Sequence, residues 1–146
     1  MSINQNSYDR DIVAWANEQA RLLREGRFEA LDIEHIADEI EDVGKSEKRE
    51  LRSRMAVLLA HLLKWQYQAG FRGNSWRRTI KIQRRGIEWA LKETPSLKTD
   101  LGNPEWWQRV WDEGVGIAVK ETGLDCFPES SPWTYDQIMD PDFWPE

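Results

Sequence analysis

Four side chains able to bind a metal ion follow one another early in the chain: Asp32, His35, Glu39 and Asp42. Their spacing of three, four and three residues places them along one stripe of an α-helix. Carboxylate oxygens and an imidazole nitrogen can share a divalent metal ion, so His35, Glu39 and Asp42 form a candidate metal site. No second segment supplies a matching set, because the other histidine, His61, lies 26 residues further along. The pattern is more typical of an acidic helix face in solvent.

A second candidate site surrounds Arg84, which falls within the apolar face of a helix predicted over 75–93. A buried guanidinium needs a carboxylate and further acceptors. Glu121 lies on the apolar stripe of the next helix, so we predict a buried polar network of Arg84 with Glu121 as a partner and His61 as a further member. The alternative is an anion or substrate pocket lined by His61, Trp65 and Arg84. His61 could then act as an acid or base, because its pKa can lie near neutrality.

A third candidate is the basic stretch that carries Arg77 and Lys81 beside Trp76. Cationic side chains next to an aromatic ring can hold phosphates and stack on bases. Residues 51–98 carry 11 basic and 2 acidic side chains, a net of +9, but residues 99–146 carry 2 basic and 11 acidic ones, a net of −9. Because the whole chain has a net charge of −6, the composition argues against a nucleic-acid-binding protein. Pairing of the basic segment with its acidic neighbours is the simpler interpretation.

Apolar residues recur at steps of three and four along most of the chain, which predicts α-helices. No segment alternates as a strand does. Gly44 either lies within the second helix or marks a kink, since glycine can also end a helix. The predicted helices span 8–25, 32–69, 75–93 and 104–122.

The segment 123–146 has four prolines and five large aromatic side chains. This composition is too apolar for a free tail in solvent, and we expect the segment to dock on the helices. The predicted fold is therefore all-α: one domain over residues 1–146, a bundle of about four helices with one long central helix, and an ordered aromatic, proline-rich C-terminal tail.

Several stretches of the chain resemble a bacterial family of small helical proteins known as domain of unknown function 29. The stretches are LDIEHIADEIEDVGKSEKREL (31–51), HLLKWQYQ (61–68), SWRRTIKIQRRGIEWAL (75–91), TPSL (94–97), ETGL (121–124) and FPESSPWTYDQIMDPDFWP (127–145). The resemblance covers nearly the whole chain. It implies a helical bacterial protein without an established activity, and it supplies no catalytic residues.

Composition sets the remaining expectations. The single cysteine, Cys126, cannot form an internal disulfide, and the N-terminal residues lack the apolar stretch of a secretory signal, so we expect a cytoplasmic protein. No apolar stretch is long enough to span a membrane. No motif predicts a cofactor, and a small-molecule ligand stays open. Nine tryptophans and a long helix favour a homodimer or another protein partner over an enzyme.

Overall fold

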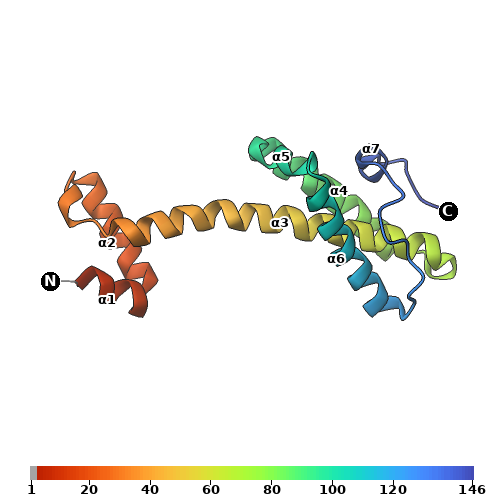
Figure 1. Cartoon of the computed structure of the whole chain (residues 1–146), viewed down its shortest axis with the longest axis horizontal. Helices are drawn as coiled ribbons and strands as arrows, with labels where there is room; N and C mark the ends of the chain where they lie inside the picture. Colours follow the sequence, from red (N-terminus) through yellow and green to blue (C-terminus); the bar gives the residue numbers. More distant parts are fainter. Residues whose placement is uncertain (1–2) are drawn as a thin grey trace. The chain divides into compact units, whose positions relative to one another are not determined.

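The computed structural model describes residues 3–146, with side chains from residue 7 onward. All regular elements among these residues are helical, which confirms the predicted all-α class (Figure 1). The α-helices are α1 (Ile3–Arg10), α2 (Ile12–Arg24), α3 (Ile33–Tyr67), α4 (Asn74–Glu93), α5 (Lys98–Leu101), α6 (Pro104–Thr122) and α7 (Tyr135–Met139), and single 3-10 turns cover Phe28–Ala30, Ala69–Phe71 and Pro95–Leu97.

The chain packs into two compact units, Met1–Ser46 and Glu47–Glu146, called here the N-terminal and the C-terminal unit. Each is described by itself. The single domain expected from length stays a prediction beside this division. No helix among residues 3–146 combines the length and the apolar character that crossing a membrane requires.

Two helices, α1 and α2, occupy the region where the sequence predicted one helix over 8–25. The chain leaves helical geometry at Asp11, whose carboxylate accepts a hydrogen bond from the backbone N–H of Ala14 at 3.1 Å. An aspartate in this position satisfies a free N–H at the start of a helix. The break therefore follows from capping, which an apolar spacing pattern does not reveal.

The long helix α3 starts and ends within two residues of the predicted bounds 32–69. It continues through Gly44, whose φ is not positive, so this glycine does not act as a C-cap. The residues that follow, from Lys45 to Glu50, include several strong helix formers, and these favour continuation over termination.

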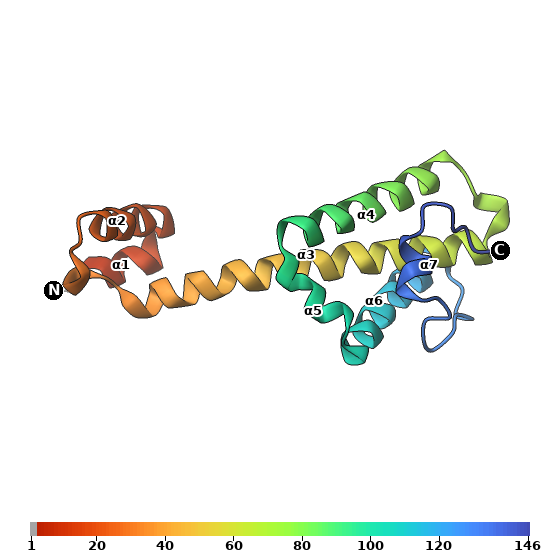
Figure 2. The same cartoon turned by 90° about the horizontal axis from the view of Figure 1, so that it is seen from above.

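The core of the C-terminal unit forms around α3 from Leu51 to Trp65, where apolar side chains are buried on several faces of the helix. α4 runs back along this part of α3 (Figure 2). The other helices add to the core Ile80, Ile87 and Leu91 from α4, Val110, Trp111 and Ala118 from α6, and Ile138 and Met139 from α7.

α6 makes its closest approach to α3 at Gly114. A β-carbon at this position would lie 3.1 Å from the carbonyl oxygen of Ala56 and 3.1 Å from the β-carbon of Leu59. These distances are tighter than ordinary van der Waals contact, so the absence of a side chain at Gly114 allows the two helices to pack as they do.

Candidate functional site

His35, Glu39 and Asp42, the predicted metal ligands, do not converge. His35 Nδ1 lies 2.7 Å from Asp32 Oδ2, and the imidazole stacks on the ring of Tyr8 with 3.8 Å between centroids. Glu39 instead accepts a hydrogen bond from the Tyr8 hydroxyl at 2.8 Å. Within the part of the chain that the structure describes, no three histidine, cysteine or acidic side chains are grouped so that they could hold a metal ion.

These contacts shift three pKa values in the N-terminal unit. Burial raises the pKa of Asp32, but hydrogen bonds with His35 and Trp15 outweigh it and leave that pKa below its usual value. The hydrogen bond to Asp32 raises the pKa of His35. The hydrogen bond to Glu39 raises the pKa of Tyr8 to about 12. Tyr8, Asp32, His35 and Glu39 are thus hydrogen-bonded to one another in pairs, and the Tyr8–Glu39 bond joins α1 to α3.

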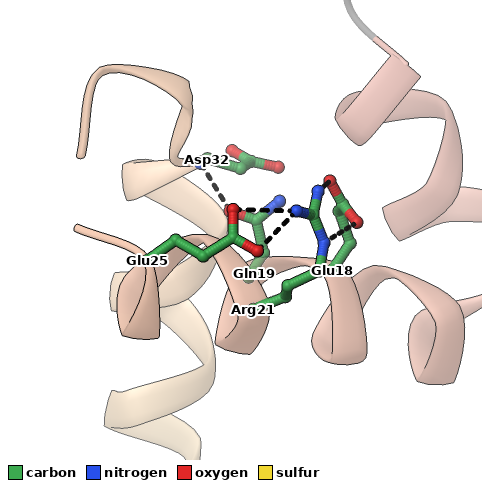
Figure 3. Close-up of polar contacts among 5 residues, drawn as sticks. All are labelled: Glu18, Gln19, Arg21, Glu25 and Asp32. Carbon is green, nitrogen blue, oxygen red and sulfur yellow. Dashed lines mark hydrogen bonds and ion pairs between the residues drawn. The ribbon is translucent and has the colours of Figure 1, made fainter. Parts of the chain in front are cut away.

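A second set of polar contacts joins α2 to the start of α3 (Figure 3). The buried side chain of Gln19 accepts a hydrogen bond from the backbone N–H of Asp32 at 2.8 Å through Oε1. Its Nε2 is buried without a hydrogen-bond partner among the described residues. On the solvent side of α2, Arg21 is held between Glu18 and Glu25 by ion pairs of 2.6 and 2.9 Å. Gln19 therefore fixes how α2 meets α3.

One face of the N-terminal unit is apolar and open to solvent. It surrounds a shallow depression of about 260 Å³ between α2 and α3. Ile40 and Val43 are each 67 % exposed, and Leu23 is 47 % exposed. We call this surface the apolar face and define it by Ala16, Ala20, Leu23, Ile36, Ile40 and Val43.

The apolar face includes residues of the apolar periodicity that predicts the helix over 32–69. Ile36, Ile40 and Val43 continue the spacing of Leu51 and Met55, and both of those later residues are fully buried in the C-terminal unit. The periodic pattern is the signal that identifies these residues as one surface. The pattern does not show which part of that surface is covered by other side chains of the protein.

Arg84 is buried, as its place in the apolar face of α4 predicted, but its partners are not carboxylates. Nε donates to the carbonyl oxygen of Ile138 and Nη2 to that of Phe143, both at 2.8 Å. The guanidinium also lies over the ring of Trp144, 5.5 Å from its centroid. Nη1 is buried without a partner among residues 3–146. Desolvation lowers the pKa of Arg84.

The expected partner Glu121 pairs with a different cation. Its carboxylate lies 2.7 Å from Lys64 Nζ, and this ammonium lies 5.0 Å from the centroid of the Trp76 ring. His61 donates through Nδ1 to the Val57 carbonyl oxygen at 2.9 Å. Burial lowers the pKa of His61. The structure therefore corrects the predicted network: Glu121 and His61 have their own partners, and Arg84 holds the C-terminal segment.

The basic residues of α4 have several environments. The Arg77 guanidinium lies over the ring of Trp65, 5.2 Å from its centroid. Lys81 lines a small cavity with Arg84, Glu88 and Met139. The exposed charges of Arg77 and Lys81 are thus placed beside the C-terminal unit's own aromatic and acidic groups.

Comparisons with other proteins add to this picture. Neither the curated proteins nor the solved structures include one that matches the chain. The sequence model of the family described as Domain of unknown function DUF29 matches residues 7–144. The match spans both units and the candidate sites described above, so the chain belongs to this family.

Proposed function

We propose that this protein is an oligomerisation module, in which the apolar face of the N-terminal unit binds the same face of a second copy. The observation that carries the proposal is the exposure of Leu23, Ile40 and Val43 around one apolar depression. Binding, rather than catalysis, is the role that an open apolar surface supports. The chain's single cysteine supports a reducing compartment such as the bacterial cytoplasm.

The described side chains of the N-terminal unit bury a small core. Its buried hydrophobic residues, among the side chains described from residue 7 onward, are Trp15 and Leu22. Units of this size bury a small share of their surface and are marginal without further contacts. Its exposed large hydrophobic residues are Ile12, Val13, Leu23, Phe28, Ile33, Ile40 and Val43. Leu23, Ile40 and Val43 among them belong to the apolar face, and covering that face would add to the small core of the unit.

The composition of the apolar face supports a second copy as the partner. Both helices contribute aliphatic side chains, Ala16, Ala20 and Leu23 from α2 and Ile36, Ile40 and Val43 from α3, so the face is apolar across both helices. A two-fold arrangement that packs α2 against the partner's α3 would cover both sets of side chains at once. Two-fold dimers with self-complementary surfaces are also the commonest soluble oligomers.

The experiment is size-exclusion chromatography with light scattering, from about 1 to about 100 μM protein, a range that detects micromolar dimers. We expect a dimer for the unmodified chain and a monomer for Ile40→Asp and for Val43→Asp. Ile82→Asp is the matched control, because Ile82 is an exposed isoleucine of α4 outside the apolar face. A monomer throughout this range, or a dimer that survives both substitutions, would contradict the proposal.

A further inference from the structure

A cavity of about 410 Å³ in the C-terminal unit has aromatic walls. Trp107 and Trp111 come from α6, whereas Trp133 and Tyr135 come from the segment that follows it. The rings of Trp107 and Tyr135 are 6.0 Å apart and inclined at 63°, and those of Trp111 and Trp133 are 5.8 Å apart and inclined at 78°. Aromatic residues from α6 and from the segment that follows it thus both line the cavity.

The indole N–H groups of Trp107 and Trp111 are occupied within the protein. Trp107 Nε1 donates to the carbonyl oxygen of Leu101, and Trp111 Nε1 donates to that of Pro128, both at 2.8 Å. These bonds fix the orientation of both rings. A ligand in the cavity would therefore meet the rings rather than their N–H groups.

The side chains of Gln108, Ser130 and Ser131 in the lining are occupied as well. Gln108 Nε2 donates to Asp112 at 2.9 Å, and the Ser130 hydroxyl donates to Gln108 Oε1 at 3.2 Å. The Ser131 hydroxyl donates to the Trp133 carbonyl oxygen at 2.9 Å and accepts from its backbone N–H. A sugar or another ligand with many hydroxyl groups needs several free donors and acceptors, and these three side chains are already bonded within the protein.

Two carboxylates act on the cavity although no charged side chain lines it. Burial raises the pKa of the Tyr135 phenol, and the carboxylates of Glu88 and Asp136 raise it further. These two carboxylates favour a cation over an anion beside Tyr135.

We propose that the aromatic cavity binds an alkylated ammonium group, the chemistry shared by choline and by a trimethylated lysine side chain. Such a cation has no N–H to satisfy, and it is attracted to the faces of aromatic rings that surround it. A primary ammonium carries three donors and a tight water shell, so it would lose more on entry than this lining replaces. The site lies in the C-terminal unit and is independent of the proposed dimer.

The test is titration calorimetry with three probes at constant ionic strength: choline, 3,3-dimethyl-1-butanol, which replaces its nitrogen with carbon, and a peptide that contains trimethyllysine. We expect choline or the peptide to bind at least about fivefold more tightly than the neutral alcohol. The stronger of the two identifies the source of the cation. Equal binding of the neutral alcohol, or no saturable binding of either cation, would overturn the proposal.

Substitutions locate the binding. Tyr135→Leu should weaken choline or peptide binding by about fivefold or more, whereas Tyr135→Phe should retain it because the ring remains. Asp136→Asn should weaken it several-fold through lost charge. Trp89→Leu is the control, since Trp89 is an exposed tryptophan outside the cavity. Circular dichroism verifies that each variant is folded, and binding that is unchanged in folded Tyr135→Leu would contradict the assignment to this cavity.

Discussion

Two arginine side chains of the C-terminal unit donate hydrogen bonds to main-chain carbonyl groups rather than to carboxylates. Arg84 illustrates this, because its guanidinium joins α4 to the carbonyl groups of Ile138 and Phe143. Arg72 holds the Trp65 carbonyl oxygen in the same way at 2.7 Å. Removing such a donor leaves buried carbonyl groups without a partner, which costs free energy.

We predict that Arg84→Lys lowers the free energy of unfolding by about 1–3 kcal/mol. Lysine keeps the charge, but its single ammonium cannot reproduce a planar fork that donates in two directions. Urea denaturation followed by circular dichroism measures the change. Arg85→Lys is the control, because Arg85 is exposed and its substitution should change stability by less than about 0.5 kcal/mol. Equal stability of the two variants would contradict this role for Arg84.

The two histidines should titrate on opposite sides of 6.5, the ordinary value for this side chain. The pKa of His35 is raised, so its contribution to stability is complete below pH 6.5 and is lost as pH rises through the folded-state pKa. The pKa of His61 is lowered, so its contribution is present above pH 6.5 and is lost as pH falls through the folded-state pKa. NMR titration of the two rings measures both values.

Asp32→Asn provides the control for this titration. It removes the carboxylate that lies 2.7 Å from His35 and should lower the pKa of His35 while that of His61 stays unchanged. The interpretation fails if His35 titrates at or below His61 in the unmodified chain.

At the scale of elements, the position of α6 depends on Gly114, although glycine lowers the stability of the helix itself. We predict that Gly114→Ala lowers the free energy of unfolding by about 1–3 kcal/mol, because the added methyl group would press on Ala56 and Leu59 of α3. Gly116→Ala is a matched control in the same helix. No atom lies within 4 Å of its added β-carbon, so the higher helix propensity of alanine should raise stability by up to about 1 kcal/mol.

Chemical denaturation of both glycine variants distinguishes packing from propensity. If Gly114→Ala were as stable as Gly116→Ala, α3 and α6 would accommodate a β-carbon at residue 114 without a loss of stability. The role given to Gly114 would then be wrong.

Helix positions were predictable from sequence to different degrees. α3, α4 and α6 begin and end within two residues of the expected bounds, because long apolar periods and Pro104 at a helix start are strong signals. The break at Asp11 was missed, since capping acts through one side chain. The partners of Arg84 were also missed. Any residue supplies a carbonyl group, so no sequence pattern marks Ile138 or Phe143 as its acceptors.

At the scale of the whole molecule, the two units differ in how much core they bury. If a second copy covers the apolar face, hydrogen exchange of amides in α2 should slow as protein concentration rises from about 1 to about 100 μM. Amides of α3 from Leu51 to Trp65 should exchange at the same rate throughout, since these side chains are buried within one chain. Mass spectrometry of deuterated peptides measures both. Exchange in α2 that does not depend on concentration would contradict the proposed dimer.

The contacts of Arg84 have a further consequence for how this protein could change over evolutionary time. An arginine that donates hydrogen bonds to main-chain carbonyl oxygens does not specify which amino acids carry these oxygens. An exposed position of the C-terminal segment, such as Asp136, could therefore change in identity while the segment remains anchored. Substitutions at such a position could change the ligand preference of the aromatic cavity while the fold stays the same.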